Sequence, residues 1–267
     1  MADVIELLST DLRLMSSDLR LNEIRYLVDL YYIYQEMRKR TGNQRLALGK
    51  AEEPCQVIDW LEIQSYKLED RIRTILTTWT RNAGPVAEWC LQQKGIGPVI
   101  TAGLMSHIDI TKAPTVGHIW RYAGLDPTSV WEPKKKRPWN ARLKTLCWKI
   151  GESFVKVSGK EDAFYGKVYL ERKAKETAAN EALQYEEQAK AKLARYKFGK
   201  NTEAYRHYIA GKLPPAHIHA RAKRYAVKLF LSHYHEVAYI DRYKESPPKP
   251  YPIGIGGHAH YIPAPGR

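Results

Sequence analysis

The sequence predicts an all-α protein, in which an N-terminal antiparallel helical hairpin precedes a larger helical domain with one long exposed helix. Apolar residues recur three and four positions apart in segment after segment, which is the spacing of one helix face. A heptad pattern spans residues 58–79, and residues 162–198 are rich in Ala, Glu and Lys. The residues before position 84 show no alternation typical of strands.

The N-terminal part, residues 1–83, carries two helical patterns. We expect the first helix to run from Asn22 to about Arg40, where Thr41-Gly42-Asn43 supplies a stop signal. The second helix has a heptad seam with one polar member, formed by Ile58, Leu61, Ser65, Leu68, Ile72, Ile75 and Trp79. A short loop between the helices favours an antiparallel hairpin, although the same seam also suits a homodimer. Asn82, Gly84 and Pro85 then mark a boundary.

The stretch Lys94-Gly95-Ile96-Gly97-Pro98 lies between two short apolar helical patterns and predicts a tight turn. Glycines permit backbone conformations that a side chain would block, and Pro98 suits the first position of a helix. Free backbone N–H groups from Gly95 to Val99 can bind an anionic oxygen and gain from the helix dipole. The turn is therefore a candidate phosphate cradle, and Lys94 beside it is a candidate to neutralise a further phosphate. The alternative is an ordinary glycine turn between two core helices.

Residues 133–149 form the strongest local charge signal, with seven basic residues and no acidic one. Trp131 and Trp139 flank the basic run, and aromatic rings beside cations are typical of nucleic-acid contacts. Asn140 is placed to cap the following helix, whose outer face is basic. The candidate DNA-binding cations here are Lys134, Lys135, Lys136, Arg137, Arg142 and Lys149. A solvated loop or a localisation tag would show the same run.

The remaining segments complete the helical prediction. We expect one long, largely exposed helix over 162–198, acting as a spacer or an oligomerisation arm, and a short helix over 201–210. A final helix over 216–241 has a basic side, which adds Arg221, Arg224 and Lys228 to the candidate DNA contacts. Residues 246–267 are dense in Pro and Gly and predict an extended or disordered tail.

Charge and composition narrow the class of partner. The chain of 267 residues carries a formal net charge of +14, which favours a polyanion, with nucleic acid ahead of an anionic membrane surface. No apolar run is long enough to span a bilayer, and residues 1–20 do not form a secretory signal, so we expect a cytoplasmic protein without a membrane partner. The separated cysteines, Cys55, Cys90 and Cys147, predict reduced thiols.

Three features occur in a familiar order: Gly95-Ile96-Gly97-Pro98, then residues 121–127 (Arg-Tyr-Ala-Gly-Leu-Asp-Pro), then Asn140 with its amphipathic helix. This order resembles the C-terminal half of insertion-sequence transposases that pair a RuvC-like catalytic domain with a helix-hairpin-helix domain. The helix over 220–239 resembles the last helix of that domain. The likeness covers roughly residues 85–243 and implies a helix-hairpin-helix domain that engages DNA.

The departures from that family concern catalysis. The family's preceding half supplies four acidic metal ligands on a sheet-rich domain, whereas here two helices precede the turn. The family also places a Ser-Gly nucleophile beyond the Gly-Leu-x-Pro motif, where this chain reads Val130-Trp131-Glu132-Pro133. Ser129 lies close but lacks the following glycine, so it is only a weak candidate.

Metal and cofactor signals are weak throughout. Three His-x-His pairs occur at 217/219, 233/235 and 258/260, but two residues apart on a helix the imidazoles diverge by about 200°. Asp109 and Asp126 could bind Mg²⁺, although turn and capping roles explain both. We find no dinucleotide fingerprint or phosphate-binding Walker loop, and we expect no cofactor or metal.

We therefore expect a hairpin at 1–83, a helix-hairpin-helix DNA-binding domain at 84–245 and a flexible tail at 246–267. The leading hypothesis is a non-catalytic, largely sequence-independent DNA-binding protein of a mobile element, phage or plasmid. A transposase or recombinase with a noncanonical serine or a separate nuclease partner is the second, and a helical scaffold is the third. RNA instead of DNA, branched DNA, and a homodimer through the heptad seam or the long helix all stay open.

Overall fold

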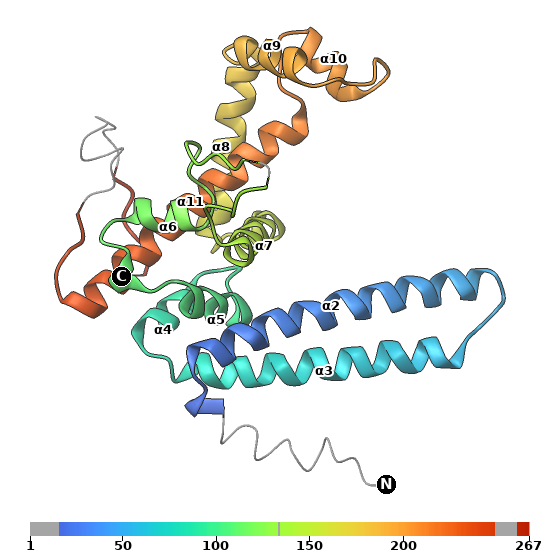
Figure 1. Cartoon of the computed structure of the whole chain (residues 1–267), viewed down its shortest axis with the longest axis vertical. Coiled ribbons are helices and arrows are strands. Elements are labelled where there is room, and N and C mark those ends of the chain that lie inside the picture. Colours follow the sequence, from blue (N-terminus) through green and yellow to red (C-terminus); the bar gives the residue numbers. More distant parts are fainter. Residues whose placement is uncertain (1–15, 133, 249–260, 267) are drawn as a thin grey trace. The chain divides into compact units, whose positions relative to one another are not determined.

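The computed structural model describes residues 16–132, 134–248 and 261–266, which form ten α-helices, two short 3-10 helices and no strand. The all-α prediction is confirmed (Figure 1). The chain divides into two compact units. Unit 1 holds the described residues up to Gln92 with Ile96–Lys112 and Asp241–Lys244, and unit 2 holds Gln93–Gly95, Ala113–Ile240 and the described residues from Glu245 onward. No helix within the described ranges combines the length and apolar character that a bilayer crossing requires.

Unit 1 begins with a 3-10 turn, η1 (Ser16–Asp18), followed by a hairpin of two long helices, α2 (Leu21–Lys50) and α3 (Gln56–Arg81). The stop signal predicted at Thr41-Gly42-Asn43 does not end α2. Thr41 Oγ1 donates to the Met37 carbonyl at 2.9 Å, so its hydroxyl is satisfied within the helix. A Cβ on Gly42 would lie 3.0 Å from the Glu62 carboxylate, so glycine allows close approach of α3. This packing between the two helices outweighs the cost of a glycine inside a helix, which is about 1 kcal/mol relative to alanine.

The hairpin core uses the predicted heptad seam within one chain. Ile72 and Trp79 of α3 are buried with Ile24 and Val28 of α2. Trp79 Nε1 also donates to the Leu19 carbonyl at 3.2 Å. Two of the seven seam residues, Ile72 and Trp79, are thus part of the hairpin core.

A short helix pair follows the hairpin: α4 (Pro85–Gln92) and α5 (Pro98–His107), with η2 (Ile110–Lys112) after them. Val99 and Ala102 of α5 are buried in the hairpin core, and Arg25 Nε donates to the Ser106 carbonyl at 3.1 Å. The predicted boundary at residue 84 therefore does not coincide with the division between units. Burial of apolar side chains assigns α5 to the hairpin.

Unit 2 contains six helices in chain order. They are α6 (Val116–Tyr122), α7 (Ala141–Val157), α8 (Phe164–Glu181), α9 (Glu186–Arg195), α10 (Glu203–Ile209) and α11 (Pro215–Tyr243). Phe154, Tyr165 and Phe230 join α7, α8 and α11, with ring centroids 4.9 to 5.6 Å apart. A smaller cluster around Leu213 buries Tyr208 at the far end of the unit.

The segment expected to be one long exposed helix forms α8 and α9, with a break at 182–185. Leu183 has a φ of +56°, and the Asn180 side chain binds both the N–H and the carbonyl of Leu213 at 2.8 and 2.9 Å. Glu176 of α8 is 2% exposed and pairs with Arg172 and Arg221. Polar contacts with later segments thus fold the chain back and cover one side of α8.

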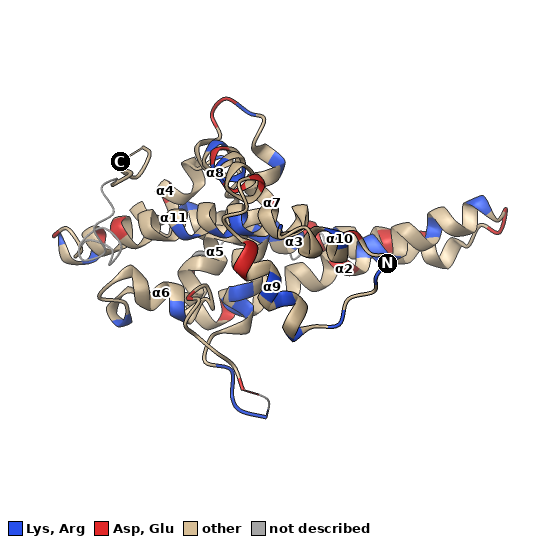
Figure 2. Ribbon diagram, turned by 90° about the horizontal axis from the view of Figure 1, so that it is seen from above, with Lys and Arg blue, Asp and Glu red and all other residues tan. Residues whose placement is uncertain are grey.

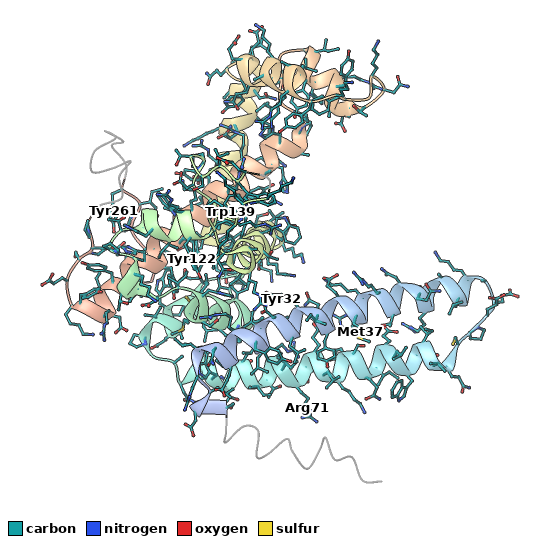
Figure 3. The ribbon with its side chains drawn as sticks, viewed as in Figure 1. Tyr32, Met37, Arg71, Tyr122, Trp139 and Tyr261 are labelled. Atoms are coloured by element: carbon teal, nitrogen blue, oxygen red, sulfur yellow. The ribbon has the colours of Figure 1, made fainter. Side chains whose placement is uncertain are left out.

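The predicted flexible tail is described only at residues 246–248 and 261–266. Tyr261 Oη lies 2.7 Å from Glu236 Oε2, and the His233 Nε2 lies 2.8 Å from the Ile262 carbonyl oxygen (Tyr261 is labelled in Figure 3). The last described residues thus lie against α11 instead of extending into solvent. His258 and His260 lie outside the described residues.

Candidate nucleic-acid interface

The loop between α6 and α7 is closed at its base by Asn140. Its side-chain oxygen accepts from the Leu143 N–H at 3.0 Å, which confirms the predicted helix cap. Its amide nitrogen donates to Tyr122 Oη at 2.8 Å, and its backbone N–H donates to the Tyr122 carbonyl at 2.8 Å. Two parts of the sequence that carry the transposase resemblance are therefore in direct contact within unit 2.

Gly124 allows Trp139 and Lys144 to pack over this base (Tyr122 and Trp139 are labelled in Figure 3). Its φ is +66°, and a Cβ there would lie 2.8 Å from Trp139 Cγ and 3.0 Å from Lys144 Cδ. Glycine is required both by the backbone conformation and by the space. The Lys144 ammonium lies 4.0 Å from the Trp139 ring centre, so a cation is held against an aromatic face.

The cations of the basic run are exposed, and several of them contact other side chains of the loop. Figure 2 shows Lys and Arg along the ribbon in blue. The Arg137 guanidinium carbon lies 5.0 Å from the Trp131 ring centre, and Trp131 Nε1 donates to the Lys135 carbonyl at 2.7 Å. Lys135 pairs with Glu132 at 2.6 Å, and both side chains are exposed. The exposed cations of this run are Lys134, Lys135, Lys136 and Arg137.

The charge of Arg224 of α11 acts on two lysines. Burial lowers the pKa of Lys144, and the charges of Arg137 and Arg224 lower it further. Burial is also the largest cause that lowers the pKa of Lys228, where Arg224 acts in the same direction and Asp126 opposes it. The positive charges are therefore close enough to repel one another. We call Arg137, Lys144, Arg224 and Lys228 the Arg224 cluster.

Lys228 is fixed against α6 by an indole. Its Nζ lies 4.0 Å from the Trp120 ring centre, and Trp120 Nε1 donates to the Lys228 carbonyl at 3.2 Å. Each lysine of the Arg224 cluster thus lies over a tryptophan ring, Lys144 over Trp139 and Lys228 over Trp120. These contacts hold the ammonium groups in place without neutralising their charge.

Two of the cations that were predicted to contact DNA form ion pairs with carboxylates of unit 2. Arg221 Nε lies 2.6 Å from Glu176 Oε2, where Glu176 is buried, and Lys94 Nζ lies 2.9 Å from Asp162 Oδ2. Arg221 therefore has a structural role in joining α11 to α8. Among the other candidates on α7, Arg142 is exposed and Lys149 is half-buried.

The two glycines of the turn differ in their surroundings. Gly95 has a φ of +95°, its carbonyl accepts from Ser153 Oγ, and an added Cβ would lie 3.2 Å from Val157 Cγ2. Gly97 has a φ of −107° and a ψ of 177°, and no atom lies within 4 Å of its ideal Cβ position. Gly95 is thus required by the fold, whereas a Cβ at Gly97 would meet no neighbouring atom.

The first turn of α5 has the features expected of the cradle, but only for main-chain contacts. Gly97 is its N-cap without a side-chain hydrogen bond, and Pro98 is its first residue. Ile96 and Val99 are 5% and 8% exposed, so their side chains are committed to packing. Any ligand here must be held by backbone N–H groups.

The two aspartates make local hydrogen bonds, whereas the Ser129 hydroxyl makes none among the described residues. The Asp126 carboxylate accepts from the backbone N–H and the hydroxyl of Thr128 at 2.9 and 2.7 Å, and these bonds lower its pKa. Asp109 binds Thr111 in the same way. Ser129 Oγ is buried and has no hydrogen-bond partner among the described residues, so no described base activates it.

The helical histidines bind neighbouring groups of unit 2. His219 Nδ1 and His233 Nδ1 each lie 2.8 Å from a tyrosine hydroxyl, and His235 Nε2 lies 2.8 Å from the Ala113 carbonyl oxygen. Burial lowers the pKa of each of these three imidazoles. Over the described ranges, no three His, Cys, Asp or Glu side chains come together as metal ligands would.

Several side chains near the Arg224 cluster are not evident from sequence reasoning. Trp120 lies under Lys228, and Lys144 covers Trp139. Trp148 is exposed on α7 beside Lys223 of α11. The four-residue spacing of Lys144 and Trp148 could have placed both on one helix face, but the proximity of α11 depends on tertiary packing.

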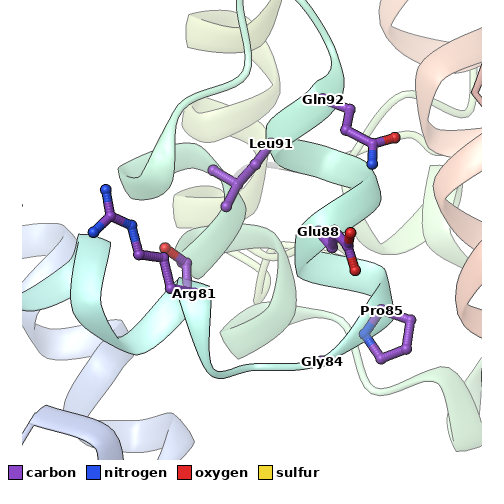
Figure 4. Close-up of a pocket in the computed structure, with 7 residues that line it drawn as sticks. Arg81, Gly84, Pro85, Glu88, Leu91 and Gln92 are labelled. Atoms are coloured by element: carbon purple, nitrogen blue, oxygen red, sulfur yellow. The ribbon is translucent and has the colours of Figure 1, made fainter.

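A cavity of about 510 Å³ lies in unit 1, between the end of α3 and α4 (Figure 4). Its lining includes one cation, Arg81, and one carboxylate, Glu88. This mixed charge offers no concentration of positive charge for a phosphate.

Comparisons of the chain with family models, curated proteins and solved structures give no match.

Proposed function

We propose that the protein binds nucleic acid, in the first place DNA, through phosphate groups and largely without regard to base sequence. The Arg224 cluster is the observation that supports this proposal most directly. Burial lowers the pKa of Lys144 and of Lys228, and the positive charge of Arg224 acts in the same direction on both lysines. A bound phosphate would relieve this repulsion, and a row of phosphates would engage the exposed run from Lys134 to Arg137 as well.

The turn at Gly95–Val99 is the second proposed contact. The open space at Gly97 and the uncapped start of α5 suit a phosphate oxygen. Such contacts fix the position of a protein on DNA but read no base, which agrees with sequence-independent binding. The transposase resemblance adds the proposal that the protein acts for a mobile element, phage or plasmid.

A charge-matched pair of variants tests the proposal. Arg224→Gln/Lys228→Gln and Lys173→Gln/Lys175→Gln each remove two positive charges, and the second pair lies on exposed positions of α8. For duplex DNA, the slope of log affinity against log salt should fall by about 0.9 for each phosphate that is no longer neutralised. We expect that change only in the Arg224/Lys228 variant. Equal slopes for both variants and the parent would refute the assigned surface.

Incubation with metal ions tests the recombinase alternative. The purified protein should bind DNA with Mg²⁺ or Mn²⁺ present and leave the strands intact. A covalent protein–DNA product that disappears in Ser129→Ala would contradict this expectation and support catalysis by the serine.

A further inference from the structure

Trp148 is an exposed aromatic ring on a helix whose core side is already filled. Its side chain is 59% exposed, while Leu143, Leu146 and Ile150 of the same helix are 3% exposed or less. The packing of α7 therefore does not need the indole. An indole left in water exposes a large apolar face, and such faces on rigid elements are typical binding groups.

The ring lies beside an ion pair that joins α7 to α11. Lys223 Nζ of α11 lies 5.8 Å from the Trp148 ring centre and is held there by the Glu152 carboxylate. A Cβ on Gly151 would lie 3.3 Å from Val227 Cγ2, so α7 and α11 approach closely at this point. Lys144, one helical turn before Trp148, belongs to the Arg224 cluster.

The chemistry around the ring distinguishes a nucleobase from an apolar protein partner. One helical turn away from Trp148, α7 carries Lys144 and Thr145 on one side and Gly151 and Glu152 on the other, and Lys223 of α11 lies beside the ring. A protein docking site would be a continuous apolar patch, whereas this is a single flat ring among polar and charged side chains. Flat aromatic faces beside cations are what a strand with unstacked bases requires.

We propose that Trp148 is a stacking platform for an unpaired base, and that the preferred ligand is nucleic acid with a single-stranded segment. This inference rests on the proposed function, because the Arg224 cluster supplies the phosphate contacts. In an intact duplex the bases are stacked on each other, so the indole can reach a base face only at a tail, gap, junction or open duplex end. The stacking role thus narrows the proposed ligand from DNA in general to nucleic acid that offers an unstacked base.

Three DNA probes separate stacking from charge: a blunt duplex, the same duplex with a single-stranded tail, and the tailed duplex with abasic residues in the tail. Trp148→Ala should lower affinity for the normal tail by about 5- to 150-fold. Affinity for the abasic and blunt probes should change less than affinity for the normal tail, because only a terminal base pair offers the indole a base face there. Trp148→Phe should keep most of the affinity for the tail, because it retains an aromatic face.

Trp60→Ala is the matched control, since Trp60 of α3 is 58% exposed in unit 1. It should bind all three probes as the parent does, and both variants should keep the parent's circular dichroism and melting temperature. Equal losses on all three probes, or no loss on the tail, would overturn the stacking role. A parent protein that binds no probe at all would instead refute the proposed function itself.

Discussion

Tyr165 Oη and His233 Nδ1 lie 2.8 Å apart in the core of unit 2, where both side chains are almost fully buried. The other ring nitrogen of His233 lies 2.8 Å from the Ile262 carbonyl oxygen. One imidazole thereby connects α8, α11 and the last described segment. Burial lowers its pKa, while the contact with Ile262 and the charge of Glu236 act in the opposite direction.

This relationship predicts acid sensitivity. A histidine in the unfolded chain takes up a proton near pH 6.5, whereas folded His233 resists it, so stability is fully present above about pH 6.5. Below that pH the unfolding free energy should fall by up to about 1.4 kcal/mol per pH unit, until the folded pKa is reached. Urea unfolding of the parent and of His233→Gln across this range measures the contribution. The variant should show a shallower dependence.

His118→Gln is the control for this prediction, because His118 is exposed on α6. It should retain the pH dependence of the parent. An unchanged slope in His233→Gln would show that protonation of this imidazole does not limit stability in acid.

A second prediction concerns Glu176, which is 2% exposed and accepts hydrogen bonds from Arg172, Arg221 and Tyr185. Burial would raise its pKa, but these donors lower it overall. Removing Glu176 leaves Arg172 and Arg221 unpaired, but water reaches both side chains, which are 36% and 25% exposed, so we expect a cost of about 1–3 kcal/mol, below that of breaking a fully buried pair. Glu176→Ala should reduce the unfolding free energy by this amount, as measured by urea unfolding.

Glu181→Ala provides the comparison, since Glu181 is an exposed residue of α8 paired with Lys212. Surface pairs contribute about 0–1 kcal/mol, so this variant should remain close to the parent. Equal stabilities of the two variants would mean that the Glu176 network does not hold α8 to α11.

Local patterns predict most helices, whereas contacts between distant segments decide the differences. Asn140 is recognisable as a cap because a cap acts within one helical turn. The break after α8 has no such local signal, because it depends on Asn180 binding Leu213, 33 residues later. A local stop signal is likewise insufficient at Gly42, where the packing of α3 lets α2 continue.

The candidate site shows the same division. The charge run and its flanking Trp131 and Trp139 are visible in the sequence, because they are neighbours along the chain. The packing of α11 against α7 and α8 brings Arg221 into an ion pair with Glu176 and places Lys223 beside Trp148. Neither contact is visible in the sequence. Charge alone cannot separate a structural arginine from one available to a ligand.

A third prediction concerns the loop cations from Lys134 to Arg137. If they bind phosphates of duplex DNA, replacing all four by Ala should flatten the plot of log affinity against log salt. The slope should fall by up to about 0.9 for each phosphate that is no longer neutralised. Because all four side chains are exposed, the unfolding free energy should change little. An unchanged salt slope would assign the run to solvent.

The last prediction uses the contrast between Gly95 and Gly97. Gly97→Val places its Cβ in open space at an ordinary extended φ, so the cost to folding should stay below about 1 kcal/mol, the size of an N-cap preference. If the backbone N–H groups of the turn bind a phosphate, the added side chain should block that approach. Loss of one hydrogen bond to a charged oxygen costs about 1.5–3 kcal/mol, which is more than tenfold in DNA affinity.

Gly95→Ala is the opposite case, because its φ of +95° and the nearby Ser153 and Val157 side chains penalise any Cβ. It should lower the unfolding free energy by about 1–2 kcal/mol, the cost of a left-handed conformation for a residue with a side chain. Measuring DNA affinity and urea unfolding for both variants therefore separates ligand contact from fold. Gly97→Val protein that is folded and binds duplex DNA as tightly as the parent would leave the turn with a purely structural role.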